Sequence, residues 1–192
     1  THAQNNVDMI TGLSSTSGDI GFTTIGSLNL NGDVTASGTV RLHSGGSIIQ
    51  SLGSISAARL ETSAQWVTTL QSAGNNVARL GNMETRGSGS IRYTGAGSFD
   101  LDGDINALDQ SVEFVSADAN AVIRQLSGTI TAGQIILSGG SYTLAGTNQI
   151  LSLGASDVRG LELSTTTDLD LLGLVRVARD LKLTADAVAH HA

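Results

Sequence analysis

The chain has 192 residues, a formal net charge of −7, 24 glycines, no proline and no cysteine. This length fits one domain, and the lack of cysteine excludes disulfides, thiol nucleophiles and thiolate metal sites. With Lys182 as the only lysine, the chain has no basic footprint for nucleic acid. No apolar run approaches the roughly 18–20 residues of a membrane span.

The segment 1–17 is polar, and we expect it to form a candidate cap over the first coil. Beyond it, apolar and polar residues alternate in short runs such as Ile20-x-Phe22 and Leu28-x-Leu30. Because alternate side chains of a strand point to opposite faces, each run predicts a short strand with two inward residues. Gly, Ser, Asn and Asp fill the gaps and predict tight corners.

The pattern repeats after 71 residues. The segment from Gly18 to Ala36 matches the segment from Gly89 to Ala107 without a gap, and a weaker third copy begins at Gly160. The stretches between them also repeat, with Gln50 matching Gln125 at an offset of 75. We therefore predict one solenoid over residues 18–185, with repeats near 18–88, 89–158 and 159–185, and a tail at 186–192.

Short strands joined by Gly-rich corners could form a sandwich, a barrel or a solenoid, and the internal repeat favours the solenoid. We predict an all-β parallel β-helix of about nine coils. Each unit holds some ten or eleven strand cores, and we expect the units to superpose by translation along the axis with a small rotation. The residues expected to point inward are Ile20, Phe22, Leu28, Leu30, Ile91, Tyr93, Phe99, Leu101, Leu161, Leu163, Leu169 and Leu171.

Several stretches carry a resemblance to a known family. GSLNLNGDVTASGTV, GSISA, GTITAG and YTLAGTN resemble the β-strand repeats of filamentous-haemagglutinin-like adhesins and related autotransporter passengers. The resemblance spans Gly18 to Ala185 and implies a right-handed β-helix that is secreted or displayed on the surface of a Gram-negative bacterium. The Asn-Pro-Asn-Gly signature of the family's secretion domain is absent, so the chain resembles an internal segment or a small relative.

The sharpest motif for chemistry is SFDLDGDINALD, from Ser98 to Asp109. Its candidate calcium ligands are Asp100, Asp102, Asp104 and Asp109. The matching segment of the first unit has Asn29 and Asn31 at the places of Asp100 and Asp102. The match favours an outward-facing strand and a corner. We assign no metal, cofactor or catalytic residue.

Two features raise a carbohydrate-related interpretation. Asp100 and Asp102 would lie about 7 Å apart on one strand face, within the roughly 6.5–9.5 Å window of inverting glycosidases. Any i, i+2 pair on a strand shares this spacing, so a solvated face is favoured. Trp66 is either a sugar-stacking platform or a local packing feature. Apart from His43, the histidines lie at the chain ends, at His2, His190 and His191.

Three functions stay open. The leading expectation is a non-enzymatic extracellular rod of a bacterial adhesin, which gives reach and adhesive display. The second is a self-assembling fibre subunit that stacks head-to-tail, and the third is a carbohydrate-active β-helix enzyme. The expected partners are the chain's own continuation or other copies by end-to-end β-stacking, and host or cell-surface glycans or proteins. Only Ala187 and Val188 follow Leu183 as apolar cover, so we expect the rod to continue past it.

Overall fold

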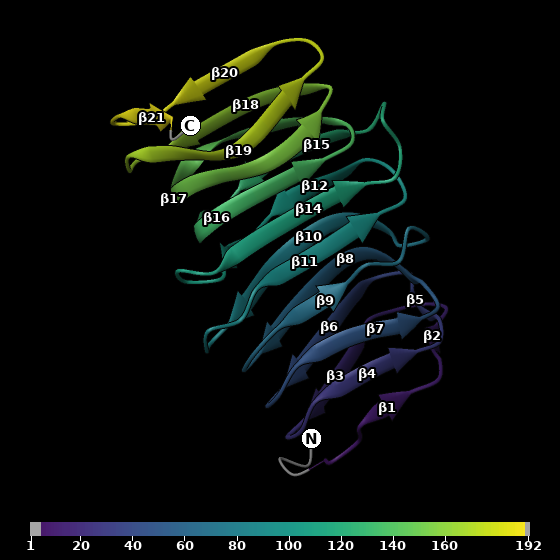
Figure 1. Cartoon of the computed structure of the whole chain (residues 1–192). Coiled ribbons are helices and arrows are strands. Elements are labelled where there is room, and N and C mark those ends of the chain that lie inside the picture. The colour runs from purple at the N-terminus through teal and green to yellow at the C-terminus, as the bar shows by residue number, and fades with distance from the viewer. Residues whose placement is uncertain (1–4, 191–192) are drawn as a thin grey trace.

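The computed structural model describes residues 5–190, and within them it contains 21 β-strands and no helix. The strand pairings of these residues are parallel, and the strands stack into one β-solenoid of about nine turns with partners about 20 residues apart. The two ends of the chain lie at opposite ends of the stack (Figure 1). The predicted all-β solenoid of about nine coils is confirmed.

Each coil has three sides, which we name faces A, B and C. Face A carries β1 (Met9–Ile10), β4 (Leu28–Asn31), β7 (Ile48–Leu52), β9 (Thr68–Leu70), β11 (Ile91–Gly95) and β14 (Ser111–Ser116). Face B carries β2 (Leu13–Ser15), β5 (Val34–Ala36), β12 (Phe99–Asp102), β15 (Val122–Ser127), β18 (Gly160–Thr165) and β20 (Leu181–Thr184).

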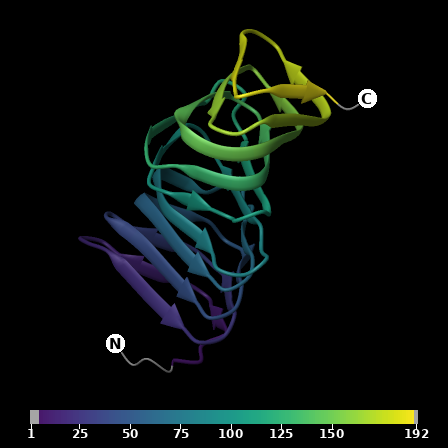
Figure 2. The same cartoon turned by 90° about the vertical axis from the view of Figure 1, so that its left-hand side faces the viewer.

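Face C carries β3 (Ile20–Thr24), β6 (Thr39–Ser44), β13 (Ile105–Asn106) and β21 (Val188–His190). Five long strands turn corners and serve more than one face. They are β8 (Ile55–Ala64), β10 (Asn76–Thr85), β16 (Ile130–Ser138), β17 (Ser141–Val158) and β19 (Leu169–Val177). The coils stack one above another, and their direction changes gradually along the stack (Figure 2). The strand pairings make each face a continuous parallel ladder.

The interior is made of apolar columns that run along the stack. Leu28, Ile48, Ile91 and Val112 belong to one column of face A, and each is fully buried. Nine of the residues predicted to point inward are buried, and Ile20, Phe22 and Leu171 are partly buried against the same core. The predicted alternation is therefore confirmed, and burial of aliphatic side chains stabilises every coil.

The solenoid is longer than predicted at both ends. Strands β1 and β2 lie within the polar segment 1–17, where Ile10 pairs with Leu30 and is only 5% exposed. Strand β21 lies within the predicted tail 186–192 and pairs with β19. Period-two apolar residues as sparse as Ile10 and Leu13 were sufficient for strands because the neighbouring coil supplies the partner. Residues 1–4 and 191–192 lie outside the described residues.

The predicted superposition by translation with a small rotation is wrong. Strand β3 lies on face C, whereas its sequence equivalent β11 lies on face A, and β4 on face A matches β12 on face B. From β3 to β11 the chain crosses ten sides, namely β4 to β7, the two parts of β8, β9, the two parts of β10, and β11. Ten sides are one more than three full coils, so each unit is turned by one third of a revolution.

The repeat specifies corners as well as strands. Asn75 is buried, and its Oδ1 accepts hydrogen bonds from Ile55 N (2.8 Å) and Gln50 Nε2 (2.9 Å). Its Nδ2 donates to Thr94 O at 3.0 Å. The second unit repeats this arrangement with Asn148, whose Oδ1 accepts from the backbone of Ile130 and from the Gln125 side chain. These side chains satisfy corner backbone groups that a strand ladder leaves unpaired.

Glycine is required where two successive corners touch. Gly53 has φ +75°, and a Cβ there would lie 2.3 Å from the carbonyl carbon of Gly32. Gly128 has φ +74° and the same contact with Gly103.

No helix of the described residues is long and apolar enough to cross a membrane.

Candidate functional site

The most prominent surface feature is a groove on face C, with a volume of about 580 Å³. It crosses β3, β6, β8 and β10, which belong to four successive coils. Its lining residues are Gly21, Phe22, Thr23, Arg41, Leu42, His43, Glu61, Thr62, Ser63, Asn82 and Glu84. At about 4.8 Å between neighbouring strands, the groove runs along the axis for roughly 14 Å.

Outward side chains line the groove in two columns. Gly21, Arg41 and Glu61 stand at matching positions of β3, β6 and β8. The second column consists of Thr23, His43, Ser63 and Glu84, which continues onto β10. The columns follow from the alternation along each strand, since residues 41 and 43 flank buried Leu42. Each coil therefore adds one outward position to each column, and at Gly21 this position carries no side chain.

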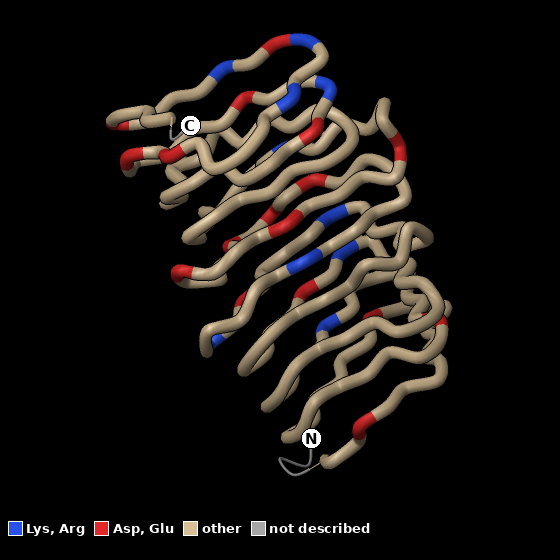
Figure 3. Tube along the Cα trace, in the orientation of Figure 1, with Lys and Arg blue, Asp and Glu red and all other residues tan. Residues whose placement is uncertain are grey.

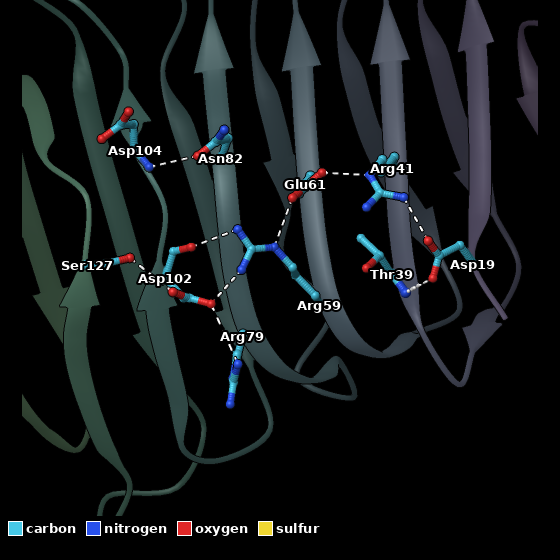
Figure 4. A network of polar contacts seen from close by, with 10 residues as sticks. All are labelled: Asp19, Thr39, Arg41, Arg59, Glu61, Arg79, Asn82, Asp102, Asp104 and Ser127. Atoms are coloured by element: carbon cyan, nitrogen blue, oxygen red, sulfur yellow. Dashed lines mark hydrogen bonds and ion pairs between the residues drawn. The ribbon is translucent and has the colours of Figure 1, made fainter.

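The first column belongs to a chain of ion pairs across coils (Figure 4). Arg41 Nη1 lies 2.8 Å from Asp19 Oδ2, and Arg41 Nε lies 2.8 Å from Glu61 Oε2. Glu61 Oε1 accepts from Arg59 Nε at 2.8 Å, and Arg59 also donates to the carboxylate and the backbone oxygen of Asp102. The network therefore ties β6 to β8 and reaches β12.

Hydrogen bonds lower the pKa of the two aspartates in this network. The backbone N–H of Thr39 and, next, the Arg41 guanidinium hold the pKa of Asp19 below its usual value. The Ser127 hydroxyl and then Arg59 lower the pKa of Asp102. Asp19 and then Glu61 raise the pKa of the Arg41 guanidinium. Because each hydrogen bond favours the charged form, Asp19 and Asp102 are ionised at neutral pH.

The second column is held by weaker polar contacts. Ser63 Oγ donates to Glu84 Oε1 at 2.6 Å, and Arg86 Nε lies 3.7 Å from the same carboxylate oxygen. Arg86 Nη2 lies 3.3 Å from His43 Nε2. Since a guanidinium only donates, this contact implies that His43 carries its proton on Nδ1. Acidic and basic residues interleave along this part of the stack (Figure 3), so the groove is close to charge balance.

Three of the four candidate calcium ligands accept hydrogen bonds from neighbouring coils, and Asp109 accepts one from the residue next to it. Asp100 accepts from Arg124 at 3.0 and 3.2 Å, and Asp102 accepts from Arg59 and Ser127. Asp104 Oδ1 accepts from Thr129 N at 2.9 Å, and Asp109 accepts from the side chain of Gln110.

The four aspartates therefore do not converge on one point. Within residues 5–190, no group of three or more His, Asp or Glu side chains could hold a metal ion. Phe99 and Leu101 are buried beside outward Asp100 and Asp102, so the predicted strand and corner are confirmed. Asp100 and Asp102, whose spacing matched that of inverting glycosidases, form ion pairs with Arg124 and Arg59.

Trp66 sits at the corner after β8 and is half exposed. A Cβ placed on Gly87 would lie 2.7 Å from Trp66 Cζ3, so the indole packs against this glycine of the next coil. This supports the local packing interpretation. His190 is exposed on β21, while His2 and His191 lie outside the described residues.

The sequence analysis did not single out the groove. Its signal is the 20-residue spacing of outward polar residues, such as Arg41 to Glu61 and His43 to Ser63. This 20-residue spacing is harder to detect in the sequence than the 71-residue repeat.

Comparison of the chain with protein-family models, with curated proteins and with solved structures gave no match. The fold and the groove therefore have to be interpreted from their own chemistry.

Proposed function

We propose that this chain is a non-enzymatic β-solenoid rod of a bacterial extracellular adhesin, which gives reach and displays adhesive groups away from the cell. The observation that carries the proposal is the uninterrupted coil-to-coil pairing of the described residues from β1 to β21. A stack of this kind transmits position along its axis, because each coil contacts only its neighbours.

Ion pairs between outward side chains also join neighbouring coils. Arg124 with Asp100, Arg92 with Glu113 and Lys182 with Glu162 each join neighbouring coils. Exposed pairs of this kind contribute little individually, about 0–1 kcal/mol each. Their placement across coils, rather than around one cleft, supports a mechanical use of the surface.

A deletion series tests the rod. Removing residues 112–134 takes out one coil, since Ile135 follows Val112 in the same column, and should leave a folded chain. Spin labels at Thr35→Cys and Thr143→Cys on face B should then approach by about 4.8 Å. Removing residues 112–122 instead places following strands on the wrong face, so this control should unfold the C-terminal coils.

The biological readout is reach. On the outer membrane of a Gram-negative cell, a C-terminal epitope should become less accessible to antibody after the one-coil deletion and more accessible after duplication of that coil. Accessibility that does not follow coil number would contradict the rod. So would hydrolysis of a polysaccharide by the intact chain that the deletion abolishes, since that result identifies an enzyme.

A specific observation favours head-to-tail stacking as a second candidate. Leu181 is 52% exposed, although it stands directly after Leu161, which is 3% exposed, in the same column. Stacking of another copy would cover it, and such a heterologous contact gives open filaments. Light scattering should then show mass rising with concentration, and Leu181→Asp should abolish the rise while Thr184→Asp on the same strand should reduce it less. A constant monomer mass would refute stacking.

A further inference from the structure

The groove on face C can bind a ligand only through side chains. The backbone groups of β6, β8 and β10 are paired with strands on both sides within the parallel ladder, and β3 is paired with β6. A peptide therefore cannot add to this face as another strand, which is the usual way a peptide gains main-chain hydrogen bonds from a sheet. The ligand therefore has to be recognised by the side chains of the two columns defined above.

The charges of the groove select against polyanions and polycations. Arg41 is already engaged by Asp19 and Glu61, and a polyanion would also meet the carboxylates of Glu61 and Glu84. A polycation would meet Arg41 and, beside the groove, Arg86. Near charge balance the favoured ligand is neutral.

The groove also selects against an apolar ligand. Covering the carboxylates, the imidazole and the Ser63 hydroxyl with hydrocarbon would remove water without supplying hydrogen bonds, which costs free energy at each group. A neutral ligand with many hydroxyls meets both requirements, because each hydroxyl donates to a carboxylate and accepts from a guanidinium or amide.

The arrangement repeats along the axis. The columns advance by one strand per coil, about 4.8 Å, which is close to the length of one sugar ring. We propose that the groove binds a neutral oligosaccharide that lies along the solenoid axis over β3, β6, β8 and β10. His43, Glu84 and the Nδ2 group of Asn82 supply direct contacts, while Asn82 Oδ1 already accepts from Asp104 N at 2.9 Å. The Arg41–Glu61 pair forms the floor. The proposal stands on the groove alone and does not require the rod function.

Two matched glycine substitutions test the site. A Cβ at Gly21 or at Gly97 would meet no atom within 4 Å, and neither glycine has positive φ, so both positions accept a side chain without strain. Gly21→Leu projects into the groove at β3, whereas Gly97→Leu projects from the corner between β11 and β12, outside it. Equal melting temperatures would show that both variants fold.

The full chain is first screened on an array of neutral and charged oligosaccharides, and the strongest neutral hexasaccharide is then titrated by calorimetry. We expect binding that weakens at least tenfold in Gly21→Leu and in His43→Ala, and that is unchanged in Gly97→Leu. The NMR signal of the His43 ring should shift on titration. The proposal is overturned if no neutral oligosaccharide binds at millimolar concentration, if Gly21→Leu binds as well as the parent, or if heparin fragments bind more tightly than neutral sugars.

Discussion

Tyr93 and Tyr142 form a matched pair in which the same substitution should have opposite consequences. Both rings are fully buried, at 1% exposure each. Tyr142 Oη lies 2.8 Å from Ser138 O and 3.0 Å from Phe114 O, so its hydroxyl is satisfied. Tyr93 Oη is buried and makes no hydrogen bond of good geometry with the described residues; only the backbone N–H of Val77 is in weak polar contact with it. Replacement by Phe removes one oxygen from each and leaves the ring packing intact.

The expected changes in the free energy of unfolding follow from the hydrogen bonds that each hydroxyl makes in the folded chain. Tyr142→Phe removes a buried hydrogen bond and leaves carbonyl oxygens without a donor, which should lower the free energy of unfolding by about 1–2 kcal/mol. Tyr93→Phe removes an unpaired hydroxyl whose burial costs about 1–3 kcal/mol, so this variant should be as stable as the parent or more stable. Its ring keeps the edge-on contact with Phe99 at 5.1 Å.

Urea unfolding followed by far-ultraviolet circular dichroism measures the difference, with both variants compared at one m-value. We expect the midpoint of Tyr93→Phe to exceed that of Tyr142→Phe by an amount equivalent to about 1–5 kcal/mol. Equal destabilisation of the two variants would refute the argument, since it would mean that the Tyr93 hydroxyl has a partner. A change of m-value would instead show that the coils no longer unfold together.

Four other expectations follow from the same structure. Burial raises the pKa of both tyrosines, so the folded chain retains protons that the unfolded chain releases, and urea midpoints should fall as pH rises above about 10, less steeply in each Phe variant. Asn75→Ala should cost about 3 kcal/mol in urea unfolding because it leaves Ile55 N unpaired, whereas the exposed neighbour Asn76→Ala should change stability by less than about 0.5 kcal/mol. Gly53→Ala should lower the melting temperature and Gly21→Ala should not, because only the first has positive φ and a carbonyl within 2.3 Å of the new Cβ. Asp102 has a lowered pKa, so its ionised form stabilises the folded chain at neutral pH, and this stabilisation is lost as pH falls through that lowered value, below about 3.9. Asp102→Asn should therefore flatten the acid side of a plot of urea midpoint against pH, and an unchanged plot would contradict the ion-pair network.

The strands were predictable because period-two alternation is a local property. Leu28 with Leu30 and Phe99 with Leu101 were assigned to the interior from spacing alone, and all four are buried. The corners were predictable only as corners. That Gln50 meets Asn75 follows from the stacking of coils, and the repeat of both residues as Gln125 and Asn148 was the one trace of it in the sequence.

The orientation of the units and the groove were not predicted, for a common reason. Both depend on the length of one coil, which sets which residues are neighbours in space. Strand β8 passes through a corner without a Gly or Asn signal, so the number of sides in a unit could not be counted reliably from turns. Arg41 and Glu61 become partners only once the 20-residue coil is known.

The one-third turn between units affects how a longer assembly of such units would meet its surroundings. Three units cross thirty sides, which is ten full coils, so a given outward motif returns to its original azimuth only after about 48 Å of rise. Between those points it faces the other two directions in turn. Tandem duplication of this unit would therefore wind any binding motif around the shaft as a slow spiral. A receptor could then engage the shaft from any side, and no face would gather enough identical, flat, aligned surface to adhere to a parallel neighbour.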